Sequence, residues 1–381
     1  MTNNQHTPQH LSAIIDAFSI EGTIATIKPY GSGHINDTFY LKNEDQTHPD
    51  YLLQRINHAI FKDVPALMDN VKKVTEHLRK KLAAIPDSNP KKQVLTIIPL
   101  KNGLLYFKDV DGNYWRMYLY LTDTNSYDLV EKEIQAFEGG KAFGRFQALL
   151  SDMDATLLAE TIPDFHNIEM RLSRFYKAWS TDIAKRRDEV NEETDFINKR
   201  VDVMKSILNL GKEGHLSLRI THNDTKFNNV LLDANDKAQC VIDLDTVMPG
   251  YVAYDFGDAI RTIINSASED EKDLNKIKLN IPLFEAYTKG YLSEADKFLS
   301  AVEVDSLMMG VLLIPYMQAV RFLTDYIEGD VYYKTNFEGH NLQRTRAQIQ
   351  LLKEIEAEHD TLVGIIDRVY NELKNATTLI S

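Results

Sequence analysis

The sequence predicts an α+β protein with two lobes: a small β-rich N-lobe with one long helix, and a large, mainly helical C-lobe. Its 381 residues exceed the roughly 100–200 residues of an ordinary domain. Near residue 121 the apolar pattern also changes, from short runs to long helical periods. We therefore predict an N-lobe over residues 1–121 and a C-lobe over residues 122–381.

Short apolar runs bounded by turn-forming residues predict the N-terminal sheet. After a helical start at 11–18, strands are expected at 24–29, 38–42, 51–56, 94–99 and 114–121. Between the third and fourth strands, Leu67, Val71, Val74 and Leu78 follow one another at helical spacing. This spacing predicts a long helix over residues 61–82 that packs on the sheet.

The pattern after residue 121 predicts long helices interrupted by one β-hairpin. Helices are expected at 129–150, 168–185, 193–210, 269–288, 293–326 and 342–373. Apolar runs at 230–232 and 239–245 flank a turn-rich segment, which predicts the hairpin.

Composition excludes several classes of protein. A net charge of −13 disfavours nucleic-acid and anionic-membrane binding, which need a basic surface. The single cysteine, Cys240, excludes an intramolecular disulfide and a cysteine-rich zinc site. The polar start lacks a signal peptide, and the apolar stretch 307–317, which contains Pro315, is about half the length that spans a bilayer. We expect a cytoplasmic monomer with no nucleic-acid or membrane partner.

The strongest chemical signal lies at residues 222–229, His-Asn-Asp-Thr-Lys-Phe-Asn-Asn. It fits H-x-D-x-K-x-x-N, the spacing of a protein-kinase catalytic loop. In that chemistry Asp224 accepts the proton of the attacking hydroxyl, Lys226 neutralises the transferring phosphoryl group and Asn229 holds a magnesium ion. The alternative is a loop of caps and turns without chemistry.

The hairpin supplies a second carboxylate to this site. Its second strand runs into Asp243, and a hairpin returns its end to its beginning, so Asp243 is expected beside Asn229. Their oxygens can share one hard cation such as Mg²⁺. The triplet Asp255-Phe256-Gly257 spells the D-F-G motif of protein kinases but lies beyond the hairpin. We expect Asp255 to cap a helix or to brace the catalytic loop.

Candidate nucleotide contacts lie in the predicted sheet. Gly31, Ser32 and Gly33 join two strands, and glycines let backbone amides approach phosphate oxygens; an ordinary turn is the alternative. Gln54 and Arg55 occupy the strand where kinases place a phosphate-binding Lys. Neighbouring strand residues face opposite ways, so at most one of the two reaches the nucleotide.

The end of the last N-terminal strand is the candidate hinge between the lobes. The backbone of Tyr120 and Leu121 is positioned to bind adenine, although a buried aromatic strand explains these residues equally well. Asp69 and Glu76 are both candidates for an acidic partner on the long helix, and the sequence does not choose between them.

On these residues the chain resembles the aminoglycoside phosphotransferase superfamily of small-molecule kinases, and most closely the N-acetylhexosamine 1-kinases. The resemblance covers nearly the whole chain and is most specific at residues 30–36, 221–226, 241–250 and 321–332. It implies a bilobal protein-kinase-like fold that uses ATP and Mg²⁺. It also implies transfer of phosphate to the anomeric hydroxyl of N-acetylglucosamine or N-acetylgalactosamine.

The resemblance implies the same base and metal ligands and adds a sugar pocket. Arg321 and Tyr332 would lie in that pocket, and Asn36 would contact sugar or phosphate. For Arg321, a structural ion pair within its apolar helix is the alternative. Gln54 matches the family at the strand position where other kinases have Lys. Arg55 differs from the family pattern and is a cation.

Two other functions stay open at this point. The acceptor could be another sugar, an amino alcohol or an aminoglycoside. The chain could also be a non-catalytic nucleotide-binding pseudokinase module, against which the complete set of Asp224, Lys226, Asn229 and Asp243 argues.

Overall fold

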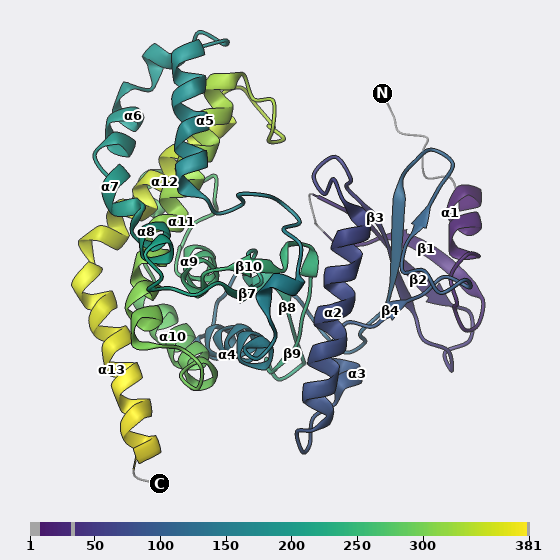
Figure 1. Ribbon diagram of the computed structural model, residues 1–381. Coiled ribbons are helices and arrows are strands. Elements are labelled where there is room, and N and C mark those ends of the chain that lie inside the picture. The colour runs from purple at the N-terminus through teal and green to yellow at the C-terminus, as the bar shows by residue number, and fades with distance from the viewer. Residues whose placement is uncertain (1–7, 32–34, 379–381) are drawn as a thin grey trace.

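The computed structural model describes residues 8–31 and 35–378, and a β-rich part and a helical part lie side by side in it (Figure 1). The β-rich part consists of α1 (Pro8–Ile15), β1 (Ile24–Pro29), β2 (Asp37–Asn43), β3 (Tyr51–Ile56), α2 (Val64–Ala83), α3 (Pro90–Gln93), β4 (Ile97–Ile98), β5 (Phe107–Lys108) and β6 (Tyr114–Leu119). Its strands form one antiparallel sheet of order β1-β2-β3-β6-β4, with β5 also paired to β6.

The two faces of this sheet bury different residues. Leu53, Trp115 and Met117 pack with α1 on one face. Ile56 and Tyr118 pack with α2 on the other. The alternation of side chains along a strand therefore fixes which residues of β3 and β6 point towards α2.

Helix α2 belongs to a core that both parts of the chain share. It starts at Asp63, whose carboxylate accepts the N–H of Ala66, as expected of an N-cap. Its buried Val71 and Val74 lie in one apolar cluster with Phe146 and Leu244 of the helical part. In Figure 1 the helix stands between the sheet and the hairpin β8–β9. The division at residue 121 remains our proposal, because this core extends across it.

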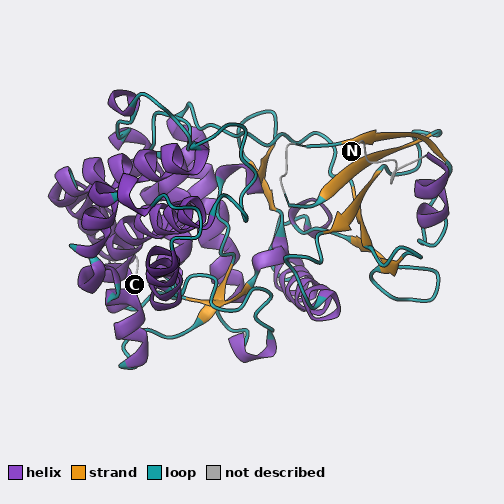
Figure 2. Ribbon diagram, turned by 90° about the horizontal axis from the view of Figure 1, so that it is seen from above, coloured by secondary structure: helices purple, strands orange, loops and turns teal. Residues whose placement is uncertain are grey.

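The helical part carries the remaining elements. They are α4 (Glu133–Leu150), α5 (Ile168–Thr181), α6 (Asn191–Asn198), α7 (Val201–Met204), α8 (Ser206–Lys212), β7 (Arg219–Thr221), β8 (Val230–Leu232), β9 (Ala238–Val241), β10 (Met248–Gly250), α9 (Val252–Ile263), α10 (Ile281–Ala295), α11 (Ala301–Glu328), α12 (His340–Ala357) and α13 (His359–Thr378), with short 3₁₀ turns η4 (Phe227–Asn229) and η5 (Leu244–Thr246). Figure 2 shows the helices gathered on one side and the sheet on the other.

Several helices begin later than the apolar pattern indicated, because N-caps fix the residues at which they start. Helix α10 begins at Ile281 and not at residue 269, since Asn280 caps it and Pro282 occupies its first turn. The predicted helix 293–326 is broken before α11, where Ser300 and Glu303 form a capping box. The segments 193–210 and 342–373 also divide into separate helices, and the predicted strand 94–99 is reduced to β4.

Helix α11 is an interior helix. By length and composition alone it could cross a membrane, but 78% of its most apolar window is buried inside the protein. It contacts α9 closely because both helices have glycine at the crossing. A Cβ added to Gly310 would lie 1.9 Å from the carbonyl oxygen of Ala253, and one added to Gly257 would lie 2.2 Å from that of Gly310.

This crossing gives a test of the fold. Gly310→Ala should lower the free energy of unfolding by about 1–3 kcal/mol, because α9 and α11 must move apart to admit the methyl group. The matched control is Gly364→Ala on α13, where an added Cβ meets nothing within 4 Å and should be neutral or slightly stabilising. Urea unfolding followed by circular dichroism measures both; equal effects of the two substitutions would contradict the account.

Candidate active site

Helix α9 holds the loop that follows β7 in place. The carboxylate of Asp255, in the first turn of α9, accepts the backbone N–H groups of His222 at 2.8 Å and Asn223 at 2.7 Å. Gln147 donates a third hydrogen bond to the same carboxylate. Asn223 has a left-handed backbone, with φ of 64°. Asp255 therefore braces this loop, one of the two structural roles expected from the sequence.

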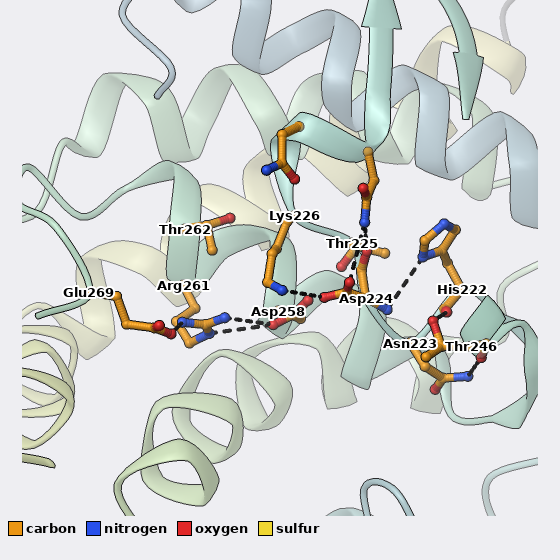
Figure 3. Close-up of polar contacts among 12 residues, drawn as sticks. His222, Asn223, Asp224, Thr225, Lys226, Thr246, Asp258, Arg261, Thr262 and Glu269 are labelled. Atoms are coloured by element: carbon orange, nitrogen blue, oxygen red, sulfur yellow. Dashed lines mark hydrogen bonds and ion pairs between the residues drawn. The ribbon is translucent and has the colours of Figure 1, made fainter. Parts of the chain in front are cut away.

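Asp224 and Lys226 form an ion pair at the centre of the loop. The Lys226 Nζ lies 3.0 Å from the Asp224 carboxylate (Figure 3). Burial alone would raise the pKa of Asp224, but the nearby Lys226 ammonium outweighs it and the pKa lies below its usual range. Asp224 is therefore ionised at neutral pH and able to accept a proton.

A second ion-pair network, centred on the buried Arg261, contributes to the electrostatics of Lys226. Arg261 contacts Asp258 at 3.2 Å and Glu269 at 2.7 Å (Figure 3). The charge of Asp224, followed by that of Asp258, raises the pKa of Lys226. The sequence analysis did not include Arg261, because a single Arg outside the recognised motifs resembles any solvated side chain.

The hairpin brings Asn229 and Asp243 to the same place. The backbone N–H of Ile242 donates to the carbonyl of Asn229 at 2.9 Å, so the residue after Ile242 lies beside Asn229. The Asn229 amide nitrogen donates to the backbone oxygen of Asp224 at 2.8 Å. This bond turns the amide oxygen of Asn229, a good ligand for a hard cation, away from Asp224.

The charges around Asp243 fit a divalent cation. Loss of hydration raises the pKa of Asp243 to about 6, and the negative charges of Asp245 and Asp224 contribute to this rise. Among the described residues Asp243 forms no ion pair, whereas Asp224 is paired with Lys226. Together with the Asn229 amide, the Asp243 carboxylate offers the oxygen donors that Mg²⁺ prefers.

A buried ion pair that the sequence analysis missed links this acidic site to the sheet. Arg116 on β6 forms two hydrogen bonds to Asp245 on η5, and their side chains are only 1% and 3% exposed. Gln54 accepts a hydrogen bond from the Arg116 Nε at 3.0 Å. The available signal was a lone cation within the apolar strand 114–119.

The structure separates the two candidates on β3. Gln54 lies opposite Arg116 and faces the acidic site. Arg55 lies on the other face of the sheet and is ion-paired with Asp37. The prediction of Arg55 as a nucleotide contact is therefore corrected, because strand alternation turns its side chain away. Gln54 is the residue of this pair that we retain.

The remaining candidates of this part of the chain are Gly31, Ser32, Gly33 and Asn36. Gly31 has a φ of +78°, which favours glycine, whereas Ser32 and Gly33 lie outside the described residues. The side chain of Asn36 donates to Asp245 at 2.7 Å and so reaches the acidic site. A pocket lined by Arg321 does not include Asn36. Asn36 was predicted to contact sugar or phosphate, and the phosphate contact suits this position better.

The predicted hinge lies next to the glycine loop. The hydroxyl groups of Tyr120 and Tyr30 are 3.5 Å apart, and Tyr30 immediately precedes Gly31. The N–H of Tyr120 donates to the carbonyl of Asp50, so a contact from Tyr120 to adenine would use its carbonyl or its ring. Leu121 is buried in the core shared with α2.

Arg321 and Tyr332 line one small pocket at the end of α11. Arg171, Arg174 and Tyr333 also line it. The turn that presents Tyr332 and Tyr333 is fixed by Asp325, whose carboxylate accepts both backbone N–H groups. The two arginines of α5 gave no signal in the sequence, because arginines on a helix are usually solvated.

Three arginines and one carboxylate, that of Asp325, line this pocket. Burial, together with the charge of Arg321, lowers the pKa of Arg171 to about 10. Arg174 is paired with Glu328. Within the described residues, Arg171 and Arg321 form no ion pair and donate to uncharged oxygens of Phe165 and Gln318.

His166 contacts the catalytic loop. Its Nε2 is 3.2 Å from the carbonyl of Asn223. Burial lowers the pKa of His166 to about 3, so its ring is neutral and donates this bond from Nε2. The carbonyl of the preceding residue, Phe165, accepts a hydrogen bond from Arg171 of the arginine pocket.

Comparison with known proteins identifies the family and the fold. Residues 26–292 match the phosphotransferase enzyme family, and the chain belongs to that family. An aminoglycoside phosphotransferase from Alicyclobacillus acidocaldarius is similar in structure, with a TM-score of 0.60, 10% identity and 98% of each chain covered.

Two further solved structures share the fold. An amicoumacin kinase in complex with AMP-PNP, Ca²⁺ and Ami has a TM-score of 0.60 and 12% identity, over 91% of this chain and 93% of that chain. A choline kinase from Cryptosporidium parvum has a TM-score of 0.56 and 16% identity, over 91% and 93%. The predicted kinase-like α+β fold is thus confirmed.

The ion pair between Arg116 and Asp245 can be tested against an exposed pair in the same sheet. Arg116→Met should lower the free energy of unfolding by about 3–5 kcal/mol, because it leaves a buried carboxylate without its partner. Arg55→Met breaks a pair whose side chains are 27% and 47% exposed and should cost less than about 1 kcal/mol. Chemical denaturation measures both, and a small loss for Arg116→Met would refute the assignment.

Proposed function

We propose that the protein is an N-acetylhexosamine 1-kinase, which transfers the γ-phosphoryl group of ATP to the anomeric hydroxyl of N-acetylglucosamine or N-acetylgalactosamine. The observation that carries the proposal is the ionised Asp224, paired with Lys226 and adjacent to the oxygen donors of Asn229 and Asp243. Membership of the phosphotransferase family supports it. The nucleotide analogue and divalent cation in the similar amicoumacin kinase support the use of ATP and a metal.

In the proposed reaction the protein places charged groups around the transferred phosphoryl group and accepts one proton from the acceptor hydroxyl. Asp224 accepts the proton of the anomeric hydroxyl while that oxygen bonds to the γ-phosphorus. The bond from the γ-phosphorus to its bridging oxygen breaks, and ADP leaves with that oxygen. Lys226 neutralises the transferring group. A Mg²⁺ ion held by Asn229 and Asp243 would supply electrostatic stabilisation of the phosphate oxygens.

The arginine pocket favours a neutral or electron-rich acceptor over a cationic one. Among the described residues Arg171 and Arg321 form no ion pair and donate to uncharged oxygens, so a protonated amine beside them would meet positive charge. The carboxylate of Asp325, which also lines the pocket, already accepts three backbone N–H groups. The hydroxyls and the acetamido oxygen of an N-acetylhexosamine can accept hydrogen bonds from arginine, and Tyr332 offers a ring face to the sugar. This distinguishes the proposal from an aminoglycoside or amino-alcohol kinase.

Substitution of the base and of the metal ligand should give different defects. Asp224→Asn should lower kcat at least about 100-fold because it removes the proton acceptor, with little change in ATP affinity. Asp243→Asn should raise the Mg²⁺ concentration needed for half-maximal rate at least about tenfold. The control is Asp367→Asn on the surface of α13. A coupled ADP-release assay measures all three, and undiminished turnover in Asp224→Asn would remove it as the base.

The acceptor pocket can be tested by kinetics with several acceptors. Arg321→Met should raise the KM for N-acetylglucosamine about 10- to 100-fold, the loss expected for a charged hydrogen bond, and leave the KM for ATP unchanged. Arg368→Met on α13 serves as the control. The assay compares N-acetylglucosamine, N-acetylgalactosamine, glucose and an aminoglycoside, with and without Mg²⁺. Faster turnover of the aminoglycoside than of both N-acetylhexosamines would contradict the proposed acceptor.

A further inference from the structure

A second cavity lies between the two lobes, at α2, α4 and β9. From the N-terminal lobe it is lined by Leu78 and Leu82 of α2. From the C-terminal lobe it is lined by Phe146 and Leu149 of α4 and by Val241. The space open to a water-sized molecule is about 110 Å³, and a wider mouth opens to solvent. None of the residues assigned above to the nucleotide, metal or acceptor lines it.

Helix α4 presents a separate face to this cavity. Glu138, Ala142, Phe146 and Leu149 follow one another at helical spacing and line the space. Gly140 lies two residues beyond Glu138, about 200° further around the helix, and packs on α10 so tightly that an added Cβ would lie 2.2 Å from a backbone oxygen. The face towards the cavity is therefore not used for packing against α10.

Two cations line the cavity without a carboxylate partner. Lys141 and Arg145 are one helical turn apart on α4. Within the described chain neither forms an ion pair, and Arg145 donates only to the hydroxyl of Ser88, at 3.3 Å. The one acid in the lining, Glu138, is already satisfied by Lys237 at 2.8 Å and by the N–H of Ala238. The cavity thus combines apolar walls with unneutralised positive charge.

We propose that this cavity binds a small amphipathic anion, with an alkyl chain or aromatic ring between the apolar walls and one carboxylate or phosphate group at Lys141 and Arg145. Both parts of the chain line the space, so the ligand contacts α2 and α4 together. Two lining residues, Val241 and Leu244, are close in sequence to Asp243. The site is separate from the proposed function and does not depend on it.

Direct binding tests the proposal with 1-anilinonaphthalene-8-sulfonate as the fluorescent probe. We expect one saturable site per chain, unaffected by saturating AMP-PNP with Mg²⁺. Octanoate and octyl phosphate should displace the probe at least tenfold more effectively than octanol, and their comparison shows which anionic group is preferred. Complete displacement by AMP-PNP, or equal displacement by octanol, would overturn the proposal.

Variants locate the site. Ala142→Phe fills the cavity, and Lys141→Met combined with Arg145→Met removes its charge; each should weaken octanoate binding at least tenfold. Lys177→Met, at an exposed position of α5, is the control and should bind as the wild type does. Thermal unfolding checks that each variant is folded. Wild-type affinity in folded Ala142→Phe or in the double charge variant would overturn the proposal.

The modification rate of the single cysteine provides an independent test that requires no amino-acid substitution. Cys240 lines the cavity and is 2% exposed, and burial raises the pKa of its thiol to about 12. Octanoate should therefore slow the already slow reaction of Cys240 with methyl methanethiosulfonate by at least fivefold, as mass spectrometry can follow. An unchanged rate at saturating octanoate would place the ligand elsewhere.

Discussion

The buried ion pair between Arg116 and Asp245 is the constraint on which the arrangement of the site depends. Two charges removed from water are costly unless each satisfies the other, and this pair does so through two hydrogen bonds. One partner belongs to the sheet and the other to the turn that follows Asp243. The sheet thereby fixes the position of the acidic turn, and Gln54 and Asn36 add hydrogen bonds to the same pair.

A second set of contacts fixes the catalytic loop from the opposite side. Asp255 holds two backbone N–H groups of the loop, and its helix α9 is set by the glycine contacts with α11. The position of Asp224 thus depends on helix packing far from the sheet. The catalytic loop and the segment leading into the acidic turn meet at the hairpin, where Asn229 bonds to Asp224 and to Ile242, the residue before Asp243.

The sequence predicted what depends on local pattern. The strands near residues 24–56, the helix α2, the hairpin and the proximity of Asn229 to Asp243 all follow from periodicity and from short-range geometry. The helix ends near Asn280 and Ser300 were wrong, because capping outweighs an apolar period that continues through the break. A cap depends on one side chain, whereas a periodic pattern reflects the average of many residues.

Long-range contacts could not be predicted in this way. Arg116 and Asp245 are 129 residues apart, and only the folded chain shows that they meet. Strand alternation showed that Gln54 and Arg55 face opposite ways, but the choice between them needed the partner across the lobes. Arg171 and Arg174 resembled solvated helix residues, and their convergence on Arg321 requires the packing of α5 against α11.

The central claim is that Asp224 deprotonates an anomeric hydroxyl for attack on ATP. The most direct measurement is ³¹P nuclear magnetic resonance of the product formed from ATP, Mg²⁺ and N-acetylglucosamine or N-acetylgalactosamine. The account predicts a new phosphomonoester resonance coupled to the anomeric proton of the sugar, absent with Asp224→Asn. A phosphate coupled to any other proton, or no phosphorylated sugar with either hexosamine, would contradict it.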